Sequence, residues 1–207
     1  MVRSAVIFLH GLGDSPAGWS SLEAQLGPAL PGDVTWRFPC APTAPVSIND
    51  GAPCASWFDI LDWPISLRAR DDRAGMAASV EAMQAVIDEL IADGVPSERI
   101  VVGGFSQGGA VALRAAFGAK QKLGACVCLS GWLFHREEFD AGANAATPVF
   151  WGHGDQDPVV LPEQQAEGAK VLAAKGVSVT AKSFGMGHSS HPQEMAELKD
   201  FLQAVLA

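Results

Sequence analysis

The sequence predicts an α/β protein with a mainly parallel central sheet that is covered by helices on both faces. Two observations support this prediction: short apolar runs typical of buried strands alternate with segments of helical periodicity, and most of these strands are separated by enough residues for a crossover helix. Each crossover places its helix on one face of the sheet. Such sheets hold their functional residues where the strands end, so functional residues are expected directly after the predicted strands.

In the N-terminal third, residues 5–9 form a β-branched and aromatic apolar run that stops at a glycine-rich turn, as a buried strand does. A helix-like stretch follows over 15–26, opened by a serine and a proline, and 34–38 is a second candidate strand. Residues 39–73 contain five prolines. Because proline lacks a backbone donor, that segment is expected to hold little regular structure.

The longest helix is predicted over 74–93, where apolar residues recur at spacings of three and four and Gly94 supplies the stop. From there to the end of the chain the pattern remains an alternation of strands and helices. The predicted elements are a strand at 100–102, a helix at 107–117, strands at 125–129 and 148–151, a helix at 163–175, an edge-type strand containing Val177 and Val179, and a final helix with an apolar face from Met195 to Val205.

Length, charge and cysteine content narrow the possible functions. A chain of 207 residues can bury a substantial core as one domain over 1–207. The net charge of −9 argues against a nucleic-acid partner, which needs a basic face. The four cysteines lack metal-ligand spacing and predict free thiols in a reducing, cytoplasmic compartment, with no metal and no cofactor. No apolar run approaches the roughly 20 residues of a membrane-spanning helix, so at most transient membrane contact is expected.

A five-residue pattern, Gly104-Phe105-Ser106-Gln107-Gly108, indicates nucleophilic catalysis. By itself it is weak evidence, since roughly one chain in ten of this length would contain such a pattern by chance. Here, however, it follows a predicted strand directly and opens a helix at Gln107. A sharp turn between strand and helix lifts the serine hydroxyl clear of the sheet. The sequence therefore favours Ser106 as a nucleophile over an incidental serine in a glycine-rich turn.

A serine hydroxyl needs a base, and the base needs an orienting acid. Two loops after later strands supply them. In the first, Asp157 is the predicted acid, although Asp155 is an alternative that can instead bond the amides of its own turn. In the second, His188 is the predicted base and is favoured over His191, because the start of the final helix disfavours an imidazolium. The order Ser, Asp, His is that of α/β-hydrolases.

The remaining histidines and the oxyanion donors complete the prediction. The backbone amide of Gln107 is expected to be one oxyanion donor and that of Leu12, in the turn after the first strand, the other, unless that turn is a plain glycine turn. We expect His10 to shape the turn after the first strand, His153 to pack beside the acid loop and His135 to be solvated.

Six segments of the chain resemble the acyl-protein thioesterase and carboxylesterase family, also described as lysophospholipases. The resemblance implies a compact α/β-hydrolase without a large cap domain, acting on S-palmitoyl groups of proteins, on lysophospholipids or on smaller esters. It also implies the same triad and oxyanion donors. The matching segments are His10-Gly11-Leu12-Gly13-Asp14, Ser56-Trp57-Phe58-Asp59, residues 103–109 (GGFSQGG), Leu129-Ser130-Gly131-Trp132-Leu133, residues 153–159 (HGDQDPV) and Gly187-His188-Ser189-Ser190.

The resemblance further implies an acyl-binding channel lined by residues 57–67, although packing against the body of the protein explains these side chains equally well. A non-catalytic ligand-binding receptor on a hydrolase scaffold is the alternative function, and the oligomeric state is open. Some animal members carry a cysteine for lipidation at position two, where this chain has Val2. The candidate channel residues are Trp57, Phe58, Ile60, Leu61, Trp63, Ile65 and Leu67.

Overall fold

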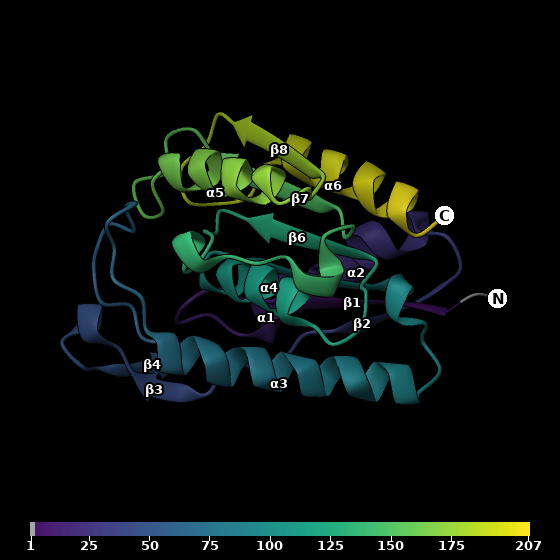
Figure 1. Ribbon diagram of the computed structural model, residues 1–207, viewed down its shortest axis with the longest axis horizontal. Helices are drawn as coiled ribbons and strands as arrows, with labels where there is room; N and C mark the ends of the chain where they lie inside the picture. The colour runs from purple at the N-terminus through teal and green to yellow at the C-terminus, as the bar shows by residue number, and fades with distance from the viewer. Residues whose placement is uncertain (1–2) are drawn as a thin grey trace.

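The computed structural model describes residues 3–207, so Val2 lies outside the described residues, and its centre is a six-stranded sheet (Figure 1). The strand order is β2-β1-β5-β6-β7-β8 and every neighbouring pair is parallel, which confirms the predicted fold class. The strand that begins at Val179 lies at the edge of the sheet, as predicted. The strands are β1 (Arg3–Leu9), β2 (Asp33–Arg37), β5 (Ile100–Phe105), β6 (Ala125–Leu129), β7 (Val149–Gly154) and β8 (Val179–Phe184).

Helices cover both faces of the sheet (Figure 1). The predicted helix over 15–26 is in fact two short helices separated by Ser20, whereas the other predicted helices are confirmed within a few residues. The α-helices are α1 (Pro16–Trp19), α2 (Ser21–Leu26), α3 (Arg73–Ala92), α4 (Gln107–Gly118), α5 (Glu163–Ala174) and α6 (Pro192–Val205). Short 3-10 helices are η1 (Gly27–Ala29), η2 (Ser47–Asn49), η3 (Ser97–Arg99), η4 (Arg136–Glu138) and η5 (Gly142–Asn144).

Alternation along the strands divides the apolar core into two layers. In β1, Ile7 and Leu9 face the layer formed with α3, α4 and α5, whereas Val6 and Phe8 face the layer formed with α2 and α6. Because side chains of a strand point alternately to opposite faces, a nearly continuous apolar run serves both layers. Cys126 and Cys128 of β6 both belong to the first layer, as their spacing predicts.

The proline-rich segment between β2 and α3 has little regular structure, as predicted. It contains a small antiparallel pair, β3 (Thr43–Pro45) with β4 (Pro53–Ala55), and then crosses the end of the sheet where the parallel strands terminate. Ile65 pairs there with Val160, a residue that follows β7. This segment therefore forms a wall beside the loops that carry the predicted site. Between residues 3 and 207, no helix is long and apolar enough to span a bilayer.

Candidate active site

Ser106 lies in a strained turn between β5 and α4. Its backbone angles are φ 55° and ψ −119°, a conformation that residues other than glycine seldom adopt. The flanking glycines are required by space: a Cβ atom on Gly104 would collide with the backbone of Gly108, and one on Gly108 would collide with the carbonyl oxygens of Leu9 and His10. The turn thus brings β5, α4 and the end of β1 together and leaves the hydroxyl of Ser106 at the end of the sheet.

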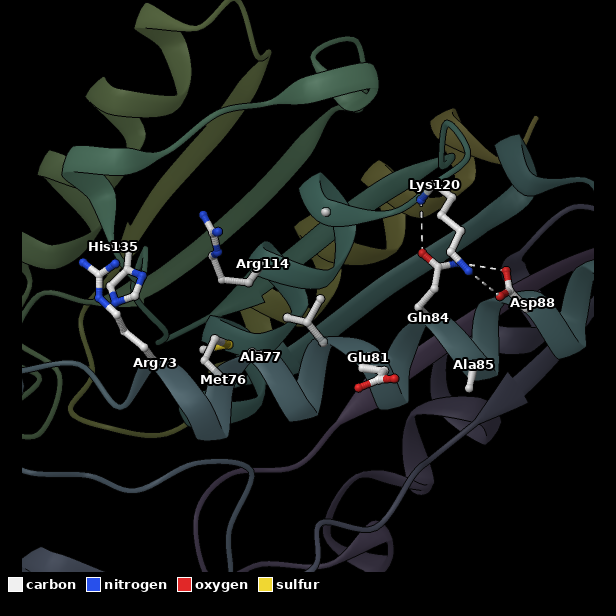
Figure 2. A pocket seen from close by; sticks show the side chains of 12 residues that line it. Arg73, Met76, Ala77, Glu81, Gln84, Ala85, Asp88, Arg114, Lys120 and His135 are labelled. Carbon is white, nitrogen blue, oxygen red and sulfur yellow. Dashed lines mark hydrogen bonds and ion pairs between the residues drawn. The ribbon is translucent and has the colours of Figure 1, made fainter.

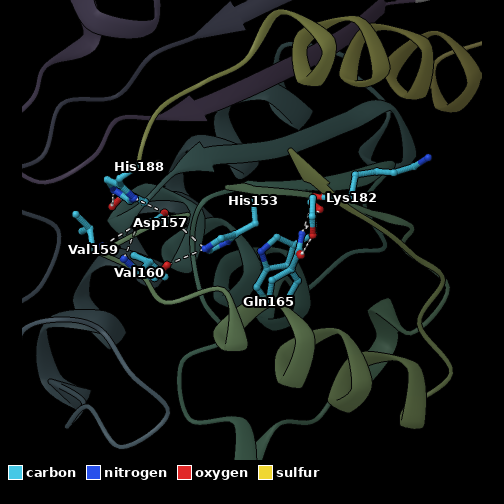
Figure 3. Close-up of polar contacts among 10 residues, drawn as sticks. His153, Asp157, Val159, Val160, Gln165, Lys182 and His188 are labelled. Carbon is cyan, nitrogen blue, oxygen red and sulfur yellow. Dashed lines mark hydrogen bonds and ion pairs between the residues drawn. The ribbon is translucent and has the colours of Figure 1, made fainter. Parts of the chain in front are cut away.

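Three side chains from three loops form a chain of hydrogen bonds at this end of the sheet. Nε2 of His188 lies 2.8 Å from Oγ of Ser106, and Nδ1 of the same ring lies 2.7 Å from Oδ2 of Asp157. Figure 3 shows Asp157 and His188 side by side, with the residues that surround the carboxylate. The structure brings together the three residues that the sequence predicts as a triad. A histidine held between a carboxylate and a hydroxyl can accept the hydroxyl proton.

The carboxylate of Asp157 is buried but well supported. Its Oδ1 accepts hydrogen bonds from the backbone amides of Val159 at 2.8 Å and Val160 at 3.0 Å. Burial favours the protonated acid, yet the hydrogen bonds from His188 and the two amides outweigh it and hold the pKa of Asp157 below its ordinary value. An ionised Asp157 accepts a hydrogen bond from Nδ1–H of His188, which keeps the ring proton on Nδ1 and leaves Nε2 free to accept from the serine hydroxyl.

The alternative residues are engaged elsewhere. Asp155 is exposed to solvent. His191 is the N-cap of α6, where its Nδ1 accepts a hydrogen bond from the Gln193 amide at 3.2 Å. His153 packs beside the acid loop, as predicted, and its Nε2 donates to the carbonyl oxygen of Val160 at 2.8 Å. Neither Asp155 nor His191 takes part in the hydrogen-bond chain to Ser106.

Two backbone amides beside Ser106 are left without a protein acceptor. Within residues 3–207, the amides of Leu12 and Gln107 have no backbone or side-chain partner, whereas the next two amides of the first turn are both used. Gly13 donates to the carbonyl of Ala55 at 2.8 Å and Asp14 to that of Gly11 at 3.3 Å. Two free backbone donors next to a serine hydroxyl are the arrangement that an oxyanion requires.

A cavity of about 200 Å³ opens beside Ser106. Of the seven candidate channel residues, Ile60, Trp63 and Ile65 line it, and Trp63 is 55% exposed at its surface. The other lining residues include Leu12, Phe105, Trp132, Val159, Val160 and His188. Trp132 and the two valines were not predicted as site residues, although each follows the end of a strand, which is the signal that could have indicated them.

The predicted channel residues Trp57 and Phe58 do not line the cavity beside Ser106. Both line a separate cavity between α3 and the β3-β4 pair, and Phe58 packs edge-on against Trp132. Leu61 is half-buried and is not in contact with the cavity beside Ser106. Apolar composition alone gives the segment its buried character, but the direction of each side chain depends on the tertiary contacts of the segment.

A larger cavity, about 680 Å³, lies between α3 and α4 and contains none of the triad residues (Figure 2). Arg73 and His135 lie at one end of it and Lys120 and Asp88 at the other (Figure 2). His135 is half-buried there rather than solvated, because its backbone amide donates to Oδ2 of Asp71 at 3.0 Å and its ring lies against the same carboxylate. Volume therefore does not identify the candidate site in this protein.

The parallel sheet, the strained serine turn and the Ser-His-Asp hydrogen bonds together define an α/β-hydrolase of the serine esterase class. A family model described as phospholipase/carboxylesterase matches residues 1–206, and the chain belongs to this family. Within residues 3–207, no group of three or more His, Cys, Asp or Glu side chains is arranged to hold a metal ion.

Named relatives agree with this assignment. The chain is 40% identical to acyl-protein thioesterase 1 of Cryptococcus neoformans var. neoformans serotype D over 223 residues, which covers 98% of this chain and 92% of the relative. It is 40% identical to a probable carboxylesterase of Oryza sativa subsp. japonica over 212 residues, covering 97% of this chain and 77% of the relative. The protein is thus a serine esterase or thioesterase that hydrolyses carboxylic esters or thioesters.

Solved structures give the same result for the fold. The crystal structure of Arabidopsis thaliana SOBER1 superposes with a TM-score of 0.91 at 31% identity, and each chain is fully covered. The crystal structure of Zea mays acyl-protein thioesterase 2 superposes with a TM-score of 0.83 at 35% identity and covers 100% of this chain and 95% of the maize chain. The likeness extends along the whole chain, and no large cap domain is present among residues 3–207.

Proposed function

We propose that this protein hydrolyses acyl esters and thioesters through an acyl-enzyme on Ser106, with His188 as general base and Asp157 as the residue that orients it. The observation that supports this most directly is the continuous hydrogen-bond chain of 2.8 Å and 2.7 Å from the serine hydroxyl through the imidazole to the carboxylate. The strained conformation of Ser106 adds support, since strain of this kind is concentrated at functional sites.

In the proposed mechanism, Oγ of Ser106 attacks the acyl carbonyl carbon while Nε2 of His188 takes the hydroxyl proton. The amides of Leu12 and Gln107 donate to the oxyanion of the tetrahedral intermediate. His188 then gives the proton to the departing alcohol or thiol, and the carbon-oxygen or carbon-sulfur bond breaks. A water molecule repeats the sequence on the acyl-enzyme, with His188 again as base, and releases the carboxylic acid.

The substrate is proposed from the relatives and from the cavity. Relatives named acyl-protein thioesterase support an acylated protein, and the family also supports a lysophospholipid or a small ester. The cavity of about 200 Å³ beside Ser106 is small for a long chain. We therefore propose short and medium acyl groups as the best substrates. A longer chain must extend past Trp63 into solvent.

A cytoplasmic location is part of the same proposal. The four cysteines are free thiols, and Cys126 and Cys128 are fully buried. Burial raises the pKa of both thiols, so neither is poised to react. Free thiols are the usual state in a reducing compartment, which supports the cytoplasm over an oxidising space.

Ser106→Ala tests the proposed mechanism. The variant should lose hydrolysis of a chromogenic short-chain ester by several orders of magnitude in kcat, because the attacking oxygen is gone. Rapid labelling of the wild-type protein by a fluorophosphonate probe, and none of the variant, should accompany this loss. A wild-type protein that is neither labelled nor active would instead indicate a receptor that binds without turnover.

Trp63→Ala tests the proposed acyl cavity. Removal of an indole at the mouth of the cavity should lengthen the space available to the acyl chain, so the acyl length with the highest kcat/KM should shift upward by two or more methylenes. Each additional buried methylene is worth about 0.8 kcal/mol, or about fourfold in kcat/KM. A series of thioesters and oxyesters of increasing chain length measures this, with Arg68→Ala as a control at an exposed position of the same segment outside the cavity. An unchanged optimum would contradict the assignment of this cavity to the acyl group.

A further inference from the structure

His10 lies at the end of β1, is 1% exposed and makes two hydrogen bonds that fix its tautomer. The backbone amide of Ala41 donates to Nε2 at 3.1 Å, and a backbone amide can only donate. Nε2 is therefore unprotonated and the proton of the neutral ring is on Nδ1. Nδ1 lies 2.8 Å from the carbonyl oxygen of Gly11, to which it donates. The imidazole thus connects the proline-rich segment to the first turn after β1.

The bond to Gly11 has a consequence for the next amide. In a trans peptide unit, the carbonyl of one residue and the amide hydrogen of the next point in opposite directions. When Nδ1 of His10 holds the Gly11 carbonyl, it also directs the Leu12 amide to the opposite side. Gly11 packs directly on Ser106 and both residues line the same cavity. The orientation of the unpaired Leu12 donor therefore depends on the imidazole behind it.

Trp57 fixes the other side of this turn. Its indole Nε1 donates to the carbonyl oxygen of His10 at 2.8 Å, and its ring centroid lies 5.3 Å from that of His10. Its backbone amide donates to Oε1 of Gln107 at 3.0 Å. The buried carboxamide of Gln107 also donates to Oγ of Ser56 at 3.0 Å and to the carbonyl of Phe58 at 2.6 Å. One buried network thus contacts the chain segments of both free amides.

We propose that His10 is a positioning residue for the oxyanion hole: through the Gly11 carbonyl it orients the Leu12 amide, and Trp57 holds it in place. The inference rests on the proposed function, because an oxyanion forms only if Ser106 attacks an acyl carbonyl. His10 touches no reacting atom in this scheme. Its contribution is the preorganisation of a donor, so it should act on the transition state and not on substrate binding.

A pair of substitutions separates the two hydrogen bonds of His10. In His10→Asn the side-chain amide nitrogen replaces Nδ1 and can still donate to Gly11, but nothing accepts from Ala41. In His10→Gln the side-chain oxygen reaches the Nε2 position and can accept from Ala41, but the donor to Gly11 is lost. We expect kcat of His10→Gln to fall on the order of 10- to 100-fold with KM little changed, and that of His10→Asn to stay within about threefold of wild type.

Affinity for a trifluoromethyl ketone, which forms a tetrahedral oxyanion with the serine, should fall in parallel with kcat/KM across the two variants. A purely structural role as an anchor of Ala41 predicts the reverse order, with His10→Asn the weaker enzyme, and that order or equal activities would overturn the proposal. Trp57→Phe loses only the donor to the His10 carbonyl and should show a smaller loss in kcat. This variant tests the same network without a change at His10, in case the two His10 variants do not fold. If Ser106→Ala also keeps activity, the proposed function fails and not merely the role of His10.

Discussion

Asp157 and Glu194 are two buried carboxyl groups near the same strand, and their pKa values are shifted in opposite directions. Asp157, 2% exposed, follows the end of β7, whereas Glu194, 0% exposed, lies in the first turn of α6 and packs against Gly152 of β7. Asp157 accepts hydrogen bonds from His188 and from two backbone amides. For Glu194, neither carboxyl oxygen has a hydrogen-bond partner within residues 3–207.

The pKa values follow from these partners. Burial raises the pKa of both carboxyls, but at Asp157 the hydrogen bonds from His188 and the amides outweigh burial and the pKa is lowered. At Glu194 burial dominates, and the pKa rises to about 7. Hydrogen-bond partners, and not burial, therefore separate the ionised carboxylate of Asp157, which can orient a histidine, from the carboxyl group of Glu194, which is protonated below about pH 7.

Of the changes at these two carboxyl groups, Asp157→Asn should have the largest effect, a loss of kcat. An asparagine amide of nearly the same shape can donate to Nδ1 of His188, which favours the tautomer with the proton on Nε2 and leaves no acceptor for the serine hydroxyl. A loss on the order of 10⁴-fold in kcat is expected, as for the equivalent change in a serine protease. Steady-state hydrolysis of a chromogenic ester measures it, and Asp155→Asn, at an exposed carboxylate two residues away, is the matched control. Equal activities of the two variants would show that Asp157 does not orient the base.

The sequence was sufficient to predict that Ser106, Asp157 and His188 lie together, because the required information is local. Each triad residue follows a recognisable strand, and the carboxyl ends of parallel strands lie at one edge of the sheet. The choice of Asp157 over Asp155 rested on reserving Asp155 for its own turn, whereas the structure leaves Asp155 exposed and places Asp157 on the amides of Val159 and Val160. The three predicted side chains therefore lie together, but the contacts that favour Asp157 over Asp155 are ones that the sequence does not display.

The wall of the acyl cavity could not be predicted in the same way. Trp57 and Trp63 belong to one apolar segment. Trp57 is buried and donates hydrogen bonds to His10 and Gln107, whereas Trp63 is exposed at the mouth of the cavity. Segments without a regular period carry no pattern that assigns side chains to one face or another. Glu194 is a similar case: a glutamate in a first helical turn is ordinary in sequence, and only its packing against Gly152 shows that it is buried.

Glu194→Gln provides the smallest but most specific test, because it acts on stability and not on the reacting groups. A folded-state pKa raised from 4.5 to about 7 means that the stability contributed by this group is fully present below about pH 4.5 and is lost as the pH rises through about 7. Glutamine keeps the shape without the ionisation. We therefore compare the free energy of unfolding of the variant with that of the wild type at each pH. The difference, variant minus wild type, should be larger at pH 8.5 than at pH 5 by up to ~3 kcal/mol.

Urea unfolding of both proteins at the two pH values measures this difference. Glu23→Gln, at an exposed position on α2, is the matched control and should leave the pH dependence of the wild type unchanged. Ester hydrolysis by Glu194→Gln at neutral pH should remain close to wild type, since the triad carboxylate is untouched. If the wild type and Glu194→Gln lose stability equally between pH 5 and pH 8.5, then Glu194 gains a partner in solution, and the contrast with Asp157 is not one of hydrogen bonding.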